Sequence, residues 1–158
     1  MKWVRIEAAD RQSITAVYEF LSGLSKEYGN FKEWYYTKVV SELSTGTRLI
    51  YSVVEKKKIV AVLILKNAEE KKICTLRVAE GYRNQGIATR LLKIAFKELE
   101  CATPIITVSS YHIEEFWPLL RKNGFHLLKE YTGYYKDGIT EYSFNGLLNE
   151  ACGLKNCA

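Results

Sequence analysis

The spacing of hydrophobic residues alternates along the chain between a period of two and a period of three to four, which predicts strands interspersed with helices. The segments with strand patterns are residues 2–8, 47–55, 59–67, 71–78, 105–108, 125–135 and 139–144. The segments with helical patterns are residues 11–24, 31–43, 86–100 and 113–122. The three strands between residues 47 and 78 follow one another directly, so we expect an antiparallel meander there. The pattern predicts one α/β (α+β) domain over residues 1–145 and a loosely structured tail over residues 146–158.

The junction between the strand at 71–78 and the helix at 86–100 is the most informative segment. It reads Arg83-Asn84-Gln85-Gly86-Ile87-Ala88, and the helix that follows repeats apolar residues in steps of four. A strand, a glycine-containing turn and a helix in this order leave free backbone N–H groups at the helix N-terminus. Together with the helix dipole, those groups form a site for a pyrophosphate. The alternative interpretation is an ordinary turn in which Gly86 only permits a tight bend.

Length, composition and charge limit the class of protein. The chain has 158 residues, 47% of them hydrophobic, which is enough for one domain with a substantial core. No apolar run approaches the roughly 20 residues of a membrane-spanning helix, and residues 1–7 lack the apolar region of a signal peptide. We therefore expect a cytoplasmic protein with no membrane partner. The net charge of +5 favours anionic ligands, including a phosphorylated cofactor or RNA, but no arginine-rich segment requires a nucleic-acid partner.

The cysteines and histidines do not form a metal-binding pattern. The four cysteines are Cys74, Cys101, Cys152 and Cys157, with no Cys-x-x-Cys pair, and the chain has two histidines. These spacings argue against a zinc site, so we expect no bound metal. Cys74 falls in a predicted strand and is expected to be a buried thiol. Cys152 and Cys157 are the one pair that would suit a redox role.

Two motifs in this element order resemble the GCN5-related N-acetyltransferase (GNAT) family. The segment from Arg83 to Ala88 matches the family pattern Arg/Gln-x-x-Gly-x-Gly/Ala after the fourth strand. Asn123-Gly124-Phe125 matches the Gly-Phe pair that closes a helix before the sixth strand. The resemblance covers residues 2 to about 145. It implies the acyl-CoA N-acyltransferase fold, with a mixed, mostly antiparallel sheet of about seven strands flanked by about four helices.

The resemblance also implies acetyl-CoA as cosubstrate, bound in a V-shaped cleft between splayed fourth and fifth strands. Backbone groups near Leu76, Arg77 and Val78 would pair with the pantetheine arm. The residues whose amides would hold the pyrophosphate are Arg83, Asn84, Gln85, Gly86, Ile87, Ala88 and Thr89. The implied reaction is direct attack of an amine on the thioester in a ternary complex. The acceptor could be a small amine, a peptide N-terminus, a lysine or an aminoacyl-tRNA. The oligomeric state is equally open between monomer and homodimer.

The chain departs from the family pattern at its expected acid and base. Leu120 occupies the position of the usual proton-donating tyrosine, and residues 74–77 contain no acidic base. Tyr111 and His112 follow the fifth strand and are our catalytic candidates, although a packed aromatic and a surface histidine are the plain alternatives. The residues expected to form an acceptor wall are Tyr28, Trp34 and Tyr134. The missing acid and base also keep open a second hypothesis, a catalytically silent acyl-CoA-binding sensor or partner-binding module.

Overall fold

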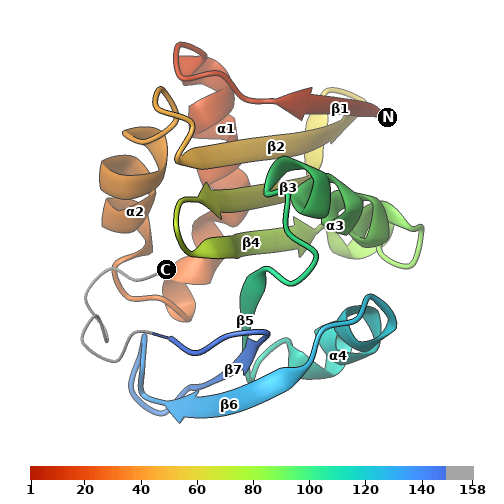
Figure 1. Ribbon diagram of the computed structural model, residues 1–158. Coiled ribbons are helices and arrows are strands. Elements are labelled where there is room, and N and C mark those ends of the chain that lie inside the picture. The colour runs from red at the N-terminus through yellow and green to blue at the C-terminus, as the bar shows by residue number, and fades with distance from the viewer. Residues whose placement is uncertain (149–158) are drawn as a thin grey trace.

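A seven-stranded sheet forms the centre of the computed structural model, which describes residues 1–148 (Figure 1). Its strands are β1 (Lys2–Arg5), β2 (Arg48–Glu55), β3 (Lys58–Asn67), β4 (Lys71–Val78), β5 (Ile105–Ser109), β6 (Leu127–Thr132) and β7 (Thr140–Phe144). Their spatial order is β1-β2-β3-β4-β5-β7-β6, and every neighbouring pair is antiparallel except β4 with β5. The parallel pair is joined through a helix, as a parallel connection requires. The predicted fold class and the antiparallel meander are therefore confirmed.

Helices cover both faces of the sheet. The helical elements are α1 (Arg11–Leu21), η1 (Ser22–Lys26), α2 (Phe31–Trp34), η2 (Tyr35–Val40), η3 (Glu80–Tyr82), α3 (Ile87–Glu98) and α4 (Ile113–Lys122). Apolar residues of α1, α2 and η2 form one core with one face of the sheet, and those of α3 and α4 form a second core with the other face. The step-of-four pattern of the predicted third helix is buried in that second core. The two sides are separate in Figure 1, where α1 and α2 lie apart from α3 and α4.

Four predicted elements end three or more residues earlier in the structure than expected. The first strand ends at Arg5, and the first helix ends at Leu21 and continues as the 3₁₀ turn η1. The second helix is α-helical only to Trp34 and then widens into the π-helix η2. The strand predicted at 125–135 spans only β6, because Gly133 takes a φ of +73° and closes a loop with its N–H on the Ile139 carbonyl. Residues 134–139 therefore lie in the connection between β6 and β7 and not on a strand.

A bulge in β4 separates that strand from β5. Ile73 pairs with Leu65 of β3 and Thr75 pairs with Ile64, so Cys74 between them has no partner residue. A bulge of this kind bends a strand and increases its twist. The pairing of β4 with β5 covers only Lys72 and Ile73 and ends where the bulge begins. The two strands diverge beyond it, which opens a cleft in the middle of the sheet.

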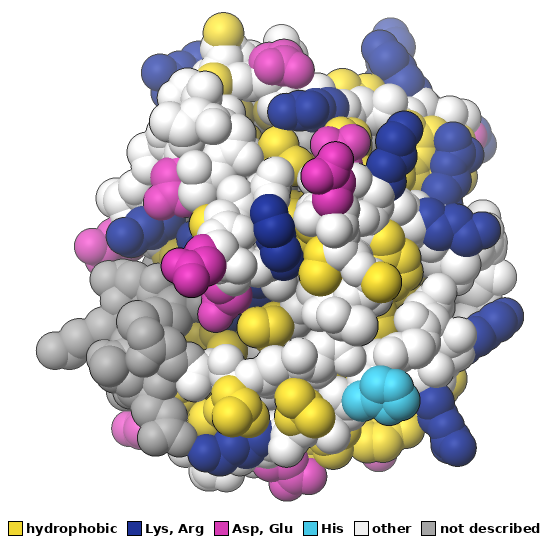
Figure 2. Space-filling model, in the orientation of Figure 1, with side chains coloured by type: hydrophobic (Ala, Val, Ile, Leu, Met, Phe, Trp, Pro, Cys, Tyr) yellow, Lys and Arg dark blue, Asp and Glu magenta, His cyan; other side chains and the backbone are white. Residues whose placement is uncertain are grey.

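The surface charge, the possibility of a membrane span and the cysteines were also subjects of the sequence analysis. Charged side chains of both signs are scattered over the face seen in Figure 2, with acidic groups among the basic ones. Within residues 1–148, no helix has the length and apolar content needed to cross a membrane. The predicted redox pair Cys152 and Cys157 lies outside the described residues. Cys74 and Cys101 are free thiols, each partly buried.

Candidate active site

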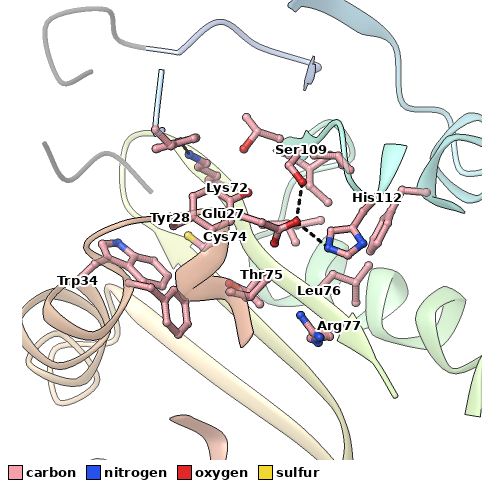
Figure 3. Close-up of a pocket in the computed structure, with 18 of the residues that line it drawn as sticks. Glu27, Tyr28, Trp34, Lys72, Cys74, Thr75, Leu76, Arg77, Ser109 and His112 are labelled. Carbon is pink, nitrogen blue, oxygen red and sulfur yellow. Dashed lines mark hydrogen bonds and ion pairs between the residues drawn. The ribbon is translucent and has the colours of Figure 1, made fainter. Parts of the chain in front are cut away.

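The cleft between β4 and β5 is lined from both sides of the sheet (Figure 3). Its walls are the end of β4, residues 74–78, and the end of β5, residues 107–109. The connection from η1 to α2 and the ring of Trp34 close it on one side. Phe116 of α4 and the turn residue Arg83 close it on the other. One opening thus joins the helix pair α1–α2 to the turn that starts α3.

The β4 wall offers backbone groups to a ligand. From Thr75 to Val78 the strand pairs with β3 on one side but has no β5 partner on the other. An unpaired strand edge binds extended chains through its N–H and C=O groups. Leu76, Arg77 and Val78, the residues predicted to contact a pantetheine arm, all line the cleft along this edge.

The turn before α3 exposes the predicted anion site. Gly86 is the N-cap residue, with φ +78° and ψ 1°, and Asn84 also has a positive φ, of 59°. The first bond of the helix runs from the Arg90 N–H to the Gly86 carbonyl at 3.0 Å. The N–H groups of residues 87–89 precede that bond and have no partner within the helix. A Cβ placed on Gly86 would meet nothing within 4 Å, so the space beside this turn is open to a ligand.

Arg83 links this turn to α4. Its Nε lies 3.1 Å from Glu115 Oε1 and donates to the Val78 carbonyl at 3.4 Å. Both partners of the ion pair line the cleft and are more than one third exposed. An exposed pair of this kind contributes little to stability. Arg83 is therefore held at the mouth of the cleft by a bond that an incoming anion can replace.

A buried carboxylate lies inside the cleft. Glu27 is 6% exposed, and its Oε1 accepts a 2.8 Å hydrogen bond from the Ser109 hydroxyl. His112 Nε2 lies 2.8 Å from the same oxygen, as the dashed lines in Figure 3 mark. His112 is at the start of α4 and Ser109 ends β5, while Glu27 follows η1. Three distant segments therefore bring an acid, a base and a hydroxyl together.

Sequence reasoning singled out His112 but missed Glu27. No motif surrounds Glu27, and its partner Ser109 is 82 residues away. Nothing in the local sequence indicates burial, because a glutamate in a short connection between two predicted helices is usually solvated. Only the docking of the η1–α2 connection against β5 makes it a buried group.

A second buried polar network lies beside the first. Tyr28 donates to Glu141 Oε1 at 2.6 Å, and Lys72 Nζ donates to the Tyr135 hydroxyl at 3.1 Å. Burial raises the pKa of Glu141 to about 7 in spite of hydrogen bonds from Tyr28 and Thr107 that oppose the rise. Burial, followed by the Glu141 charge, also raises the pKa values of Tyr28 and Tyr135 above their ordinary range. These tyrosines therefore remain protonated donors at neutral pH.

The remaining predicted residues divide between the cleft and its surroundings. Tyr28 and Trp34 line the cleft. Tyr134 is 7% exposed in a separate cluster with Tyr131 and Leu148, and Tyr135 lines the cleft in its place. Tyr111 is 67% exposed and is not among the lining residues.

Two observations bear on alternative chemistry. Leu120, at the position of the family's proton donor, is fully buried in the core beneath α4. Its side chain therefore cannot be reached from the cleft. Among residues 1–148, no group of three or more His, Cys, Asp or Glu side chains could hold a metal ion.

The divided sheet, the open turn before α3 and the cleft between them define an acyl-CoA N-acyltransferase type of fold. A family model described as an acetyltransferase (GNAT) domain matches residues 20–142. The chain therefore belongs to the GNAT acetyltransferase family. A comparison of the sequence with curated proteins finds no match.

Solved structures agree with this assignment. An aminoglycoside 6'-N-acetyltransferase complexed with coenzyme A matches with a TM-score of 0.68 and 13% identity, over 91% of this chain and 95% of that one. The NatC complex bound to Gag peptide and CoA matches with a TM-score of 0.69 and 17% identity, over 91% and 97%. Nourseothricin acetyltransferase matches with a TM-score of 0.56 and 14% identity, over 62% of this chain and 64% of that one. The last match therefore covers less than two thirds of its partner, and likeness at these identities shows the fold alone.

Proposed function

We propose that the protein is an N-acetyltransferase that transfers acetyl from acetyl-CoA to an amine by direct attack in a ternary complex. The observation that carries the proposal is the Glu27–His112 pair, with 2.8 Å between its atoms, in the cleft whose opposite wall is the unpaired edge of β4. An acyl donor on that edge and an amine beside that pair would meet inside one opening. Two members of the same fold carry CoA in their solved complexes, which supports the choice of donor.

The residues present fit the donor. The edge from Leu76 to Val78 provides N–H and C=O groups along the length of a pantetheine arm. The N–H groups at the start of α3 and the helix dipole favour a pyrophosphate, and the open space beside Gly86 admits it. When bound, acetyl-CoA supplies an activated acyl group on a thiolate leaving group. A backbone N–H near Val78 would polarise the thioester carbonyl.

The Glu27–His112 pair would remove the proton from the incoming amine. An amine attacks only in its neutral form, so the arriving ammonium must first lose a proton. His112 would accept that proton, and Glu27, whose Oε1 lies 2.8 Å from His112 Nε2, would orient the ring. Ser109 would act as a positioning residue, because its hydroxyl fixes the same Glu27 oxygen.

The bond changes balance without a tyrosine donor. The amine nitrogen forms a bond to the acyl carbon, the carbon–sulfur bond breaks, and the electron pair leaves on the CoA sulfur. The second amine proton and the leaving thiolate combine to give free CoA thiol, directly or through the protonated His112. None of these proton transfers requires a side chain at the position of the buried Leu120.

The second candidate is an acyl-CoA sensor without turnover. The observation in its favour is Leu120, which leaves α4 without the family's usual acid. A sensor would bind acetyl-CoA with the same groups and acetylate nothing. Turnover is therefore the property that separates the two.

The decisive experiment follows release of free thiol from acetyl-CoA in the presence of a panel of amines. We expect an amine-dependent release and a rise in melting temperature on addition of acetyl-CoA. Binding without release on any amine would favour the sensor, and the absence of a thermal shift would remove the donor assignment.

Substitution of the pair tests the proton path. We expect Glu27→Gln and His112→Gln each to lower kcat by roughly 10²- to 10⁴-fold, with CoA affinity preserved. The matched control is His126→Gln, since His126 is the other histidine of the chain and is exposed. An unchanged kcat in both cleft variants would show that another group takes the proton.

A further inference from the structure

The guanidinium of Arg77 lies on the side of the cleft that α1 and α2 cover. Glu27 lies on the same side, which is called the acceptor side below. Arg77 pairs across the strands with Val62, which belongs to the core under α1 and α2, so its side chain faces that side of the sheet. The Nη2 atom of Arg77 lies beside Gly23 of η1. A Cβ atom placed on Gly23 would be 3.7 Å from it. In Figure 3, Arg77 lies below Thr75 and Leu76, and Glu27 lies above them.

Among residues 1–148, no acidic side chain pairs with this cation. Within the described part of the chain, the Arg77 side chain makes no hydrogen bond and no ion pair, although its backbone belongs to the β3–β4 ladder. The buried Arg48, by contrast, has Nε 2.9 Å from Glu42 Oε2, and Arg83 is paired with Glu115. Arg77 is only half-exposed and lines the cleft. A half-buried guanidinium without a partner favours an anion from a ligand.

The cleft therefore carries opposite charges on its acceptor side. Glu27 and His112 provide the acidic pole that receives an ammonium, and Arg77 provides the basic pole. The rings of Phe31 and Trp34 line the same opening. A molecule complementary to this arrangement has an amine and an anionic group on one small framework.

We propose that the acceptor is an amine that also carries a carboxylate, of the amino-acid class, with the carboxylate bound by the Arg77 side chain and the amine directed to the Glu27–His112 pair. The planar fork of the guanidinium binds a carboxylate through two parallel hydrogen bonds, and the aromatic wall accommodates the rest of the molecule. This proposal rests on the proposed function, because it names the substrate class of that reaction. It gives the Arg77 side chain a role separate from that of its backbone on the β4 edge.

The test compares amino acids with their decarboxylated amines in the thiol-release assay. The probes are L-phenylalanine with phenethylamine and L-tyrosine with tyramine. We expect wild type to prefer the amino acid by about 10- to 100-fold in kcat/KM, and Arg77→Gln to lose that preference through a higher KM for the amino acid. The comparison of both proteins on both substrates cancels the intrinsic reactivity of each amine.

Two controls separate a carboxylate site from other roles of Arg77. Arg11→Gln, at the exposed start of α1, removes the same charge away from the cleft and is expected to keep the preference. The CoA affinity of Arg77→Gln, measured by calorimetry, is expected to stay within about threefold of wild type, since the side chain faces the acceptor side. A large loss of CoA affinity would overturn the proposal, because Arg77 would then bind the donor.

Failure of this proposal is distinguishable from failure of the proposed function. Acetylation confined to amines without a carboxylate, or an equal preference in wild type and Arg77→Gln, would overturn the acceptor class and leave the transferase standing. If no amine is acetylated although CoA binds, the transferase falls, and L-phenylalanine is titrated into the protein–CoA complex. Binding that Arg77→Gln abolishes would then support the carboxylate site, and no binding would overturn it.

Discussion

Replacing Glu141 with glutamine is expected to flatten the pH dependence of stability. Glu141 is 2% exposed on β7 and accepts a 2.6 Å hydrogen bond from Tyr28. Burial raises the pKa of its carboxyl from an ordinary 4.5 to about 7. A carboxyl with a raised pKa is protonated in the folded protein and ionised in the unfolded chain between those two values. The folded state then holds more protons, so the free energy of unfolding falls as pH increases through this window.

The size of the effect follows from the pKa difference. One pKa unit corresponds to about 1.4 kcal/mol, so a rise from 4.5 to about 7 amounts to on the order of 3 kcal/mol. The contribution of Glu141 is fully present below pH 4.5 and is lost once the pH exceeds about 7. Glutamine resembles the protonated acid and can still accept the Tyr28 hydrogen bond through its side-chain oxygen. The variant should therefore differ least from wild type at pH 5 and exceed it most in stability at pH 8.

Urea unfolding at a series of pH values between 5 and 8 measures this difference. Glu130→Gln is the matched control, because Glu130 lies exposed on the adjacent strand β6. We expect the control to follow wild type at every pH. If Glu141→Gln and wild type kept parallel pH profiles, the carboxyl would not titrate in this window and the account of its burial would be wrong.

Further predictions concern the cofactor cradle and the core. Gly86→Glu should abolish CoA binding in calorimetry through charge and bulk at the anion site, whereas Gly86→Asn, which tolerates the φ of +78°, should lose much less; equal affinities would contradict the cradle. Glu115→Gln, which frees Arg83 from its ion pair, should raise CoA affinity by up to about fivefold, and a lower affinity would mean that the pair helps to form the site. Tyr35→Phe removes a buried 2.7 Å hydrogen bond to the Ile14 carbonyl and should cost about 1–3 kcal/mol in urea unfolding, and an unchanged midpoint would refute that value.

Local patterns were sufficient to predict the elements that surround the proposed donor site. The strand at 71–78, the turn from Arg83 to Ala88 and the helix after it are all set by residues close in sequence. The cap of the first helix is equally local, because Asp10 directly precedes α1 and its side chain accepts the Ser13 N–H at 3.0 Å. Such features depend on backbone geometry and on apolar periodicity, which a single segment contains.

The proposed acceptor site depends on contacts between segments that are far apart in the sequence. Glu27 becomes a buried group only because its connection docks on β5, 82 residues away, and Tyr28 meets Glu141 across 113 residues. The same limit explains the predicted sites that were misplaced. Tyr134 and Tyr135 were expected on one strand, but the turn at Gly133 sends only Tyr135 to the cleft.

The sequence by itself determined the order of the elements, the apolar face of α3 and the turn that starts it, because each follows from neighbouring residues. The tertiary structure alone decided where β4 leaves β5, since that point is a bulge at Cys74 in the pairing with β3. It also decided which charges meet in the resulting cleft. Burial, desolvation and cross-strand pairing act between residues that are distant in the chain. Glu27, His112 and Arg77 therefore line one cleft only when the sheet has formed.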